Sequence, residues 1–447
     1  MNASVAPLGL WCGRGTGVLR RARDGAIVLR WAERWQNGRL CRCSRRGRSG
    51  KKPATRVVDT IDTSEGGHMS VTATTAAEAP GAPLPEAVDV VVVGAGQAGL
   101  SVAWHLRRLG MTPGSDLLVL DRGPDTGGAW QFRWQALRLD LVHKVDDLPG
   151  MRELGLSFDT ADPTRPARDI VREYYDRYER HFDLRVRRPV HVHRVHTGKD
   201  GEFVLETDHG TVRTTVLINA TGTWARPFRP HVPGAADFAG VQISTPEYRA
   251  AEDFAGRRVL VVGGGTSAIG FLHELEHVAS DTLWVTRRPV TFTDAVDGRG
   301  AVREADEAAR AGRQLPSIVS GTGLPATPAN LAARDRGLLV ARPMFTSIEP
   351  DGVRWDDGTF EPVDTIIWAT GFRAELTHLA PLRLREPGGG IQVENGRSVR
   401  EPRLFLAGYG PQASTIGANR AGRTLARQAF AELDRPAADA RSTAGMR

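Results

Sequence analysis

Two glycine-rich segments constrain this chain more than any other feature of its sequence. The first reads GAGQAG at 94–99, after the apolar run VDVVVV at 88–93 and before a helical pattern at 100–109. A strand, a G-x-G-x-x-G turn and a helix in this order are typical of a dinucleotide-binding βαβ unit. A second short strand is expected at 117–120, and it ends at an acidic residue, Asp121.

The residues of this first segment have separate expected roles. Gly94 permits the tight turn, Gly96 lets the backbone approach a pyrophosphate, and Gly99 lets the helix pack closely on the strand. The pyrophosphate is expected at the helix N-terminus, and Asp121 is expected to accept hydrogen bonds from an adenosine ribose. The predicted cofactor-binding residues of this unit are Gly94, Gly96, Gln97, Ala98, Gly99, Asp121 and Arg122.

The second segment repeats the pattern with one informative difference. It reads GGGTSA at 263–268, after a strand at 258–262 and before a helix at 269–278. The next strand, at 282–286, ends in two arginines instead of an acid, and guanidinium groups there suit a 2′-phosphate. This favours NADP(H) over NAD(H), with a solvated arginine pair on a loop as the alternative. The predicted residues are Gly263, Gly265, Thr266, Ser267, Ala268, Arg287 and Arg288.

Two nucleotide sites in one chain indicate that electrons pass between the two nucleotides. NADPH supplies a hydride, so the other nucleotide must carry a redox group, for which a flavin in FAD is the most economical choice. The sequence therefore predicts FAD and NADPH as cofactors.

Short turns of small residues add to the predicted sites. Two apolar strands end in A-T-G triplets, one in each half of the chain, where a backbone could cross near a cofactor. A strand at 404–407 leads to a helix from 415 to about 433, whose N-terminus is expected near the flavin; an ordinary docking helix is the alternative. The residues concerned are Ala220, Thr221, Gly222, Ala369, Thr370, Gly371, Gly408 and Gly417.

The basic charge of the chain belongs to its first residues. The formal net charge is +7, but residues 1–68 hold 14 of the 59 Lys and Arg and only 5 of the 52 Asp and Glu. The rest of the chain is close to neutral, so the charge does not indicate a nucleic-acid partner. Residues 25–35 could form one short amphipathic helix. The stretch SEGGHM before Met69 resembles a translated ribosome-binding site, and our hypothesis is that Met69 is the natural start.

Cysteine usage excludes two classes of protein. The three cysteines, Cys12, Cys41 and Cys43, all lie within residues 1–68, and three thiols cannot form a disulfide framework. Residues 69–447 contain no cysteine, which excludes a flavoprotein that carries electrons through its own dithiol. No metal-ligand cluster and no catalytic side chain stands out.

The order of these motifs resembles the flavin-containing monooxygenase-like branch of the two-dinucleotide-binding-domain flavoproteins, the class B flavin monooxygenases. The resemblance covers about 88–431 and includes the GGAW segment with Gly128 and Trp130, which adds these two residues to the predicted FAD site. Ser244 stands at the His position of the family's short motif. The resemblance implies FAD in the first unit, NADPH in the second, and a reduced flavin that reacts with O2 to give a C4a-(hydro)peroxide.

The predicted fold class is α/β, with two Rossmann-like domains and the NADPH domain inserted in the FAD domain. We expect a basic leader at 1–85, the FAD domain at 86–225 and 372–435, the NADPH domain at 226–371, and a tail at 436–447. The expected function is oxygenation of a small organic substrate with O2, by a cytoplasmic protein without a membrane span, and a homodimer stays open. The alternatives are an NADPH:acceptor reductase and a nucleotide-binding redox sensor.

Overall fold

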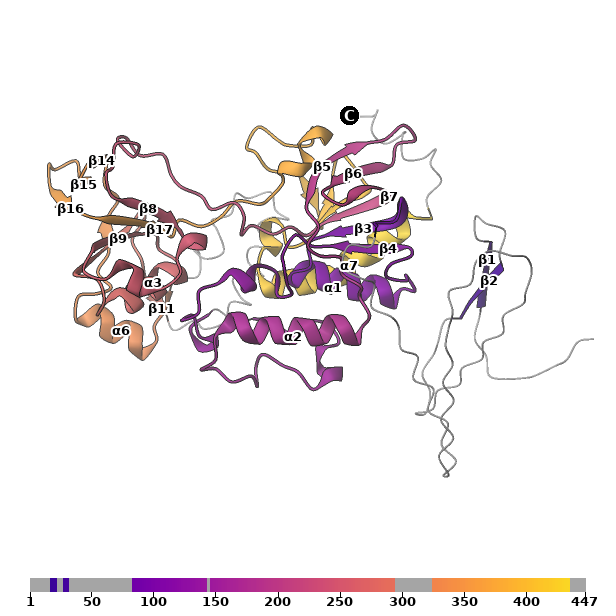
Figure 1. Ribbon diagram of the computed structural model, residues 1–447, viewed down its shortest axis with the longest axis horizontal. Helices are drawn as coiled ribbons and strands as arrows, with labels where there is room; N and C mark the ends of the chain where they lie inside the picture. Colours follow the sequence, from indigo (N-terminus) through magenta and orange to yellow (C-terminus); the bar gives the residue numbers. More distant parts are fainter. Residues whose placement is uncertain (1–16, 22–26, 32–82, 143–144, 294–323, 435–447) are drawn as a thin grey trace, which may run out of the picture. The chain divides into compact units, whose positions relative to one another are not determined.

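The computed structural model describes residues 17–21, 27–31, 83–142, 145–293 and 324–434 (Figure 1). The chain divides into two compact units, 1–76 and 77–447. In the first, β1 (Gly17–Arg21) pairs antiparallel with β2 (Ile27–Trp31). The expected helix over 25–35 is therefore wrong, because the β-branched and aromatic residues of IVLRW favour a strand. Met69 and the three cysteines lie outside the described residues.

The larger unit contains an eight-stranded sheet whose centre is parallel. Its main order is β18-β19-β20-β7-β3-β4, and the long strand β7 also pairs with the β5-β6 hairpin. Strands β4, β3, β7 and β20 run parallel, and the others pair antiparallel. The strands are β3 (Ala87–Val93), β4 (Leu117–Leu120), β5 (Val192–Thr197), β6 (Phe203–Thr207), β7 (Gly210–Asn219), β18 (Val393–Glu394), β19 (Arg397–Ser398) and β20 (Leu404–Leu406).

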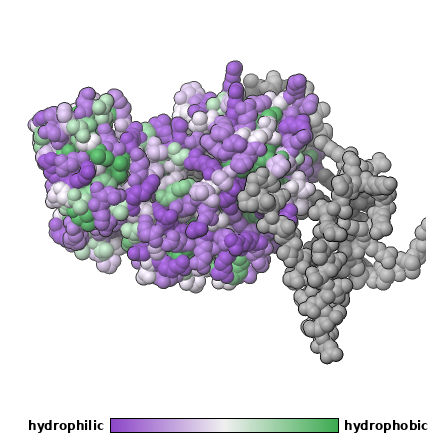
Figure 2. Space-filling model, viewed as in Figure 1, coloured by the Kyte–Doolittle hydropathy of each residue, from purple (hydrophilic) through white to green (hydrophobic). Residues whose placement is uncertain are grey.

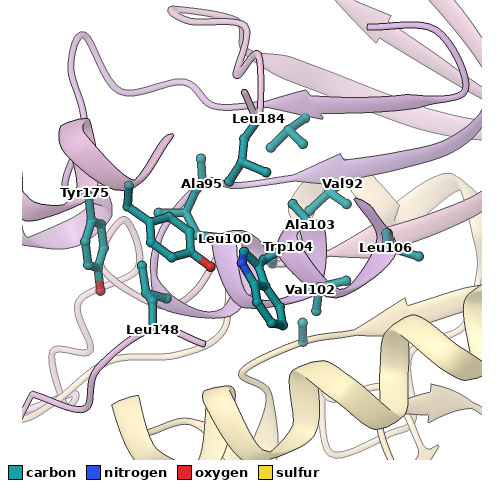
Figure 3. Close-up of a cluster of buried hydrophobic side chains, with 14 of the residues drawn as sticks. Val92, Ala95, Leu100, Val102, Ala103, Trp104, Leu106, Leu148, Tyr175 and Leu184 are labelled. Carbon is teal, nitrogen blue, oxygen red and sulfur yellow. The ribbon is translucent and has the colours of Figure 1, made fainter. Parts of the chain in front are cut away.

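Helices and apolar side chains cover this sheet. Helix α1 (Gln97–Arg108) packs against α7 (Thr415–Glu432), and α2 (Ala167–His181) contributes to the same core. Val92 from the sheet, Leu100 from α1 and Tyr175 from α2 are all fully buried there (Figure 3). The apolar run in β3 is buried because parallel strands are covered on both faces.

A second, five-stranded parallel sheet holds the second glycine-rich segment. Its order is β13-β10-β9-β17-β8, with every pair parallel. The strands are β8 (Val241–Ser244), β9 (Arg258–Val262), β10 (Asp281–Thr286), β13 (Arg342–Pro343) and β17 (Thr365–Trp368). Helices α3 (Thr266–Leu275) and α6 (Pro328–Asp335) belong to this part of the chain. In the sequence, the strands of this second sheet all lie between β7 and β18 of the first sheet. One α/β domain is therefore inserted in the other, as predicted.

Short strands form two further small sheets. They are the pair β11 (Phe292–Thr293) and β12 (Leu324–Pro325), and the sheet β14 (Ser347–Glu349), β15 (Gly352–Arg354) and β16 (Phe360–Pro362). Hydrophilic residues cover most of the face seen in Figure 2, with hydrophobic ones in small groups. None of the helices in the described ranges is long and apolar enough to cross a membrane. The same residues contain no cluster of side chains that could hold a metal ion.

The segment just before β5 pairs with another strand of the first sheet. β5 itself starts at Val192 and pairs with β6. The residues before it bond to the end of β4 instead: Arg187 N–H donates to Val119 O at 2.8 Å, and Val190 N–H donates to Asp121 O at 2.8 Å. This segment is thus an edge partner of β4 before it joins the hairpin.

Candidate functional site

The first glycine-rich turn is tight because its glycines touch backbone. Gly94 has φ +107°, and a Cβ on it would lie 2.3 Å from Ala220 O. A Cβ on Gly99 would lie 1.8 Å from Gly94 O. Gly96 differs, since a Cβ there would be 3.8 Å from the nearest atom, Gly128 Cα, and its φ of −86° suits any residue. Protein packing therefore requires glycine at 94 and 99 but leaves space beside Gly96.

The N-termini of α1 and α3 differ from those of two other helices. Gly96 and Gly265 are their N-caps, and neither helix receives a side-chain cap or has an acidic residue in its first turn. In contrast, Thr327 and Ser414 cap α6 and α7 through their side chains. Uncapped N–H groups at a helix start attract phosphate oxygens. Both glycine-rich turns thus fit the pyrophosphate of a dinucleotide.

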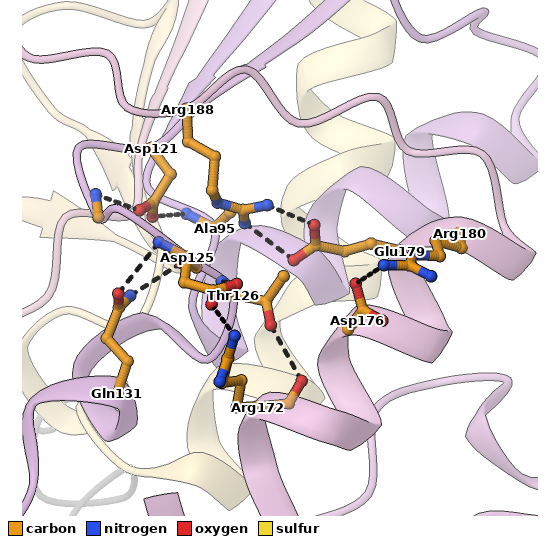
Figure 4. Close-up of polar contacts among 11 residues, drawn as sticks. Ala95, Asp121, Asp125, Thr126, Gln131, Arg172, Asp176, Glu179, Arg180 and Arg188 are labelled. Atoms are coloured by element: carbon orange, nitrogen blue, oxygen red, sulfur yellow. Dashed lines mark hydrogen bonds and ion pairs between the residues drawn. The ribbon is translucent and has the colours of Figure 1, made fainter. Parts of the chain in front are cut away.

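Asp121 lies at the end of β4, beside the first turn. Its carboxylate accepts hydrogen bonds from Ala95 N at 2.6 Å and from Gly123 N at 2.7 Å (Figure 4). These bonds hold the turn in place. Each carboxylate oxygen can accept a further bond, which keeps the carboxylate compatible with a ribose hydroxyl.

The A-T-G triplets lie against the glycine-rich turns in both halves. Ala220 O touches Gly94, as described, and a Cβ on Gly263 (φ +145°) would lie 2.2 Å from Ala369 O. The two glycine-rich turns are therefore packed in the same way. The chain segments at the ends of the two triplets also pair with each other: Phe228 N–H donates to Gly371 O at 2.9 Å, and Arg373 N–H donates to Arg226 O at 2.8 Å.

Buried polar groups fix the first of these triplets. The Thr221 hydroxyl donates to Glu375 O at 2.7 Å. His378 Nε2 is 2.8 Å from Asn219 Oδ1, one residue before the triplet. Burial lowers the pKa of His378 to about 4, so the ring is neutral at pH 7 and donates this bond. Sequence reasoning missed His378, because no local pattern links it to a strand 159 residues earlier.

The structure gathers Gly222 and Gly408 but engages other predicted residues within the protein. Gly222 and Gly408 line one hollow, together with Asn219, Thr223, Ala374, Ala407, Tyr409, Gly410 and Ala413. The Gln97 side chain donates to Asp146 O at 2.8 Å and accepts from the Tyr175 hydroxyl. Gly417 N–H donates to Ser414 Oγ at 3.0 Å. These polar groups of Gln97 and Gly417 are occupied without a cofactor.

The two arginines after β10 are exposed. Arg288 O accepts a hydrogen bond from the Thr286 hydroxyl at 2.9 Å, which fixes the backbone of the pair. Neither Arg287 nor Arg288 forms an ion pair that fixes its guanidinium within the described ranges. Both groups can therefore meet a phosphate.

A half-buried carboxylate joins the loop after the GGAW segment to α3. Glu274 accepts hydrogen bonds from Trp134 Nε1 at 2.6 Å and from the Tyr248 hydroxyl at 2.9 Å. Burial raises the pKa of Glu274. Ser244, at the position of the family's His, accepts a hydrogen bond from Arg229 Nε at 2.7 Å. Ser244 thus connects the end of β8 to the segment around Arg229, which follows the first A-T-G triplet.

Comparison with known proteins agrees with these two linked sites. Residues 91–303 match the pyridine nucleotide-disulphide oxidoreductase family. A solved flavin-containing monooxygenase from Stenotrophomonas maltophilia is 34% identical, with a TM-score of 0.67, and the match covers 78% of this chain and 99% of that one. The chain therefore belongs to the flavin-containing monooxygenase family, and it is a flavin-dependent oxidoreductase.

Two curated relatives match over most of their length. One is the uncharacterized oxidoreductase CzcO of Bacillus velezensis, 25% identical over 71% of this chain and 91% of its own. The other is the indole-3-pyruvate monooxygenase YUCCA4 of Oryza sativa, 28% identical over 68% of this chain and 80% of its own. The expected family and fold class are confirmed.

Proposed function

We propose that this chain is an NADPH- and FAD-dependent monooxygenase of a small organic substrate. FAD binds the unit formed by 86–225 and 372–435, and NADPH binds 226–371. The observation that carries the proposal is the pair of helices, α1 and α3, that start at uncapped glycines against matching A-T-G turns. FAD held by this unit would supply the oxygen chemistry: the electrons come from NADPH, one atom of O2 enters a soft nucleophile or a carbonyl, and the other leaves as water.

The protein's own residues bind and orient the cofactors. The N-termini of α1 and α3 hold the two pyrophosphates, Asp121 accepts from the FAD ribose, and Arg287 with Arg288 binds the 2′-phosphate of NADPH. The remaining predicted residues, from Ala98 and Arg122 to Thr266, Ser267, Ala268 and Thr370, line these sites. A dithiol route is excluded for residues 69–447, which contain no cysteine.

Coupling of O2 to NADPH tests this function against the acceptor-reductase alternative. With a panel of sulfides and ketones, we expect NADPH oxidation and O2 uptake in a one-to-one ratio, with a product that contains one added oxygen atom. Fast anaerobic NADPH oxidation with a quinone, and no oxygenated product in air, would identify a reductase instead. If neither activity is observed, the protein is better explained as a nucleotide-binding redox sensor.

The arginine pair predicts the choice of nicotinamide cofactor. In the double variant Arg287→Gln/Arg288→Gln, loss of two charge-assisted contacts should raise KM for NADPH about 100-fold, because each is worth about 1.5 kcal/mol. KM for NADH, which lacks the 2′-phosphate, should change little. Steady-state kinetics with both cofactors measures this, and Arg334→Gln on α6 is the matched surface control. An equal rise for both cofactors would place the phosphate elsewhere.

A further inference from the structure

Arg133 lies between two tryptophan rings at the junction of the two sites. Its guanidinium carbon is 4.0 Å from the centre of the Trp224 ring and 5.4 Å from that of Trp130. Trp224 in turn stacks on Phe372, with ring centres 5.1 Å apart. Trp130 follows the loop that touches Gly96, and the other two rings follow the A-T-G turns. The cation thus sits where segments from both halves meet.

The charge of Arg133 has no counter-ion in the part of the chain that the structure describes. Its Nε is buried and lacks a hydrogen-bond partner there. Burial alone lowers the pKa of Arg133 to about 10, with no carboxylate acting against it, and the group is still charged at pH 7. Arg133 as a whole is half-buried. Contact with aromatic faces stabilises its cation in part, but a charge that is partly removed from water is normally paired.

The aromatic contact leaves the hydrogen-bond donors of the guanidinium to other partners. The Trp224 ring offers no strong acceptor to the group that lies over it, and the N–H donors of a guanidinium lie in its own plane as a fork. This fork matches the two oxygens of a carboxylate or a phosphate. Phosphates of both dinucleotides already have places, at the starts of α1 and α3 and at Arg287 and Arg288. A carboxylate is therefore the better match.

We propose that Arg133 binds a carboxylate group of the substrate, so that the enzyme acts on organic acids. This inference rests on the proposed function only in treating the bound acid as the molecule that is oxygenated. Binding of a carboxylate at Arg133 is a property of the FAD-loaded protein whether or not the acid reacts. Arg133 is a specificity-determining residue in this proposal, and it takes no part in moving protons or electrons.

Two probes that differ in one group test the proposal. Phenylpyruvate and phenylacetone share a benzyl ketone, and only the first carries a carboxylate. Isothermal titration of each into FAD-loaded protein should show tighter binding of phenylpyruvate, and Arg133→Gln should reduce the ratio of the two affinities about tenfold or more. Arg165→Gln, which removes an exposed arginine paired with Glu173, should leave the ratio as it is. Arg133→Lys keeps the charge and loses the fork, and it should give an intermediate ratio.

Three outcomes would overturn the proposal. One is equal affinity of the natural protein for both probes, and another is a ratio that Arg133→Gln does not change. The third is weaker NADP+ binding in Arg133→Gln with an unchanged ratio, which would assign the cation to a phosphate. If Arg133→Gln does not retain FAD, Arg133→Lys alone decides the result. An Arg133-dependent ratio without any oxygenated product would support this inference while the proposed function fails.

Discussion

Replacing Gly96 by alanine is expected to remove FAD from a protein that still folds. The new methyl group would lie 3.8 Å from Gly128 Cα, an ordinary contact, and the backbone at φ −86° tolerates alanine. It would, however, fill the space where a pyrophosphate must approach the start of α1. We expect FAD affinity to fall about 100-fold or more, equivalent to ~2.7 kcal/mol. Flavin content after gel filtration and titration of the apoprotein measure this.

Two further glycines serve as controls for this result. Gly94→Ala should damage the fold as well, by about 3 kcal/mol or more, because it combines a left-handed φ with a 2.3 Å approach to Ala220 O. Gly264→Ala, in the second turn, meets the methyl groups of Val290 at 3.4 Å and Thr286 at 3.8 Å, and it should keep both FAD and stability. Normal FAD binding by Gly96→Ala would show that the pyrophosphate does not lie at the start of α1.

The Arg188–Glu179 ion pair should give the largest loss of stability of any single charge in the described chain. Both Arg188 Nη atoms donate to the Glu179 carboxylate, at 2.6 and 2.9 Å, and the side chains are only 13% and 9% exposed (Figure 4). Burial raises the pKa of Glu179, and Arg188 opposes this. Arg188→Met leaves a buried carboxylate alone, which should cost about 3–5 kcal/mol by urea unfolding.

The pH dependence and a surface pair on the same helix sharpen this test. Without Arg188 the pKa of Glu179 rises further above its unfolded value of 4.5, so the folded state binds more protons. The loss should therefore shrink as pH falls toward 4.5 and grow as pH rises. The Asp176–Arg180 pair, with an arginine that is 79% exposed, is the control, and Asp176→Asn should cost about 0.3–0.5 kcal/mol. Equal losses for the two pairs would contradict the assigned burial.

Local patterns explain which parts of the fold were predictable. Strands β4 and β9 were predicted to the residue, and β3, β10, β20 and α7 to within one residue, because apolar runs and glycine turns are short-range signals. Helix α2 was missed although its buried residues at 167, 170, 171, 175 and 178 follow helical spacing. The many charged residues between these positions made the helical spacing of the buried ones hard to recognise in the sequence.

Long-range contacts explain what the sequence could not provide. The Trp134–Glu274 bond joins residues 140 positions apart, and no pattern near either residue points to the other. The contact of Arg133 with Trp224 also depends on how a loop and a connecting segment meet in space. Whether a predicted polar group is free for a ligand likewise requires the fold, as Gln97 and Gly417 illustrate.

Rapid mixing of the NADPH-reduced protein with O2 tests the central claim most directly. A monooxygenase should be reoxidised in two spectrally distinct phases, the first faster with more O2 and the second slow in the absence of substrate. An oxygenatable substrate should speed the second phase and leave one oxygen atom in the product. A single-phase return to oxidised flavin, with one H2O2 released per flavin, would contradict the proposed function.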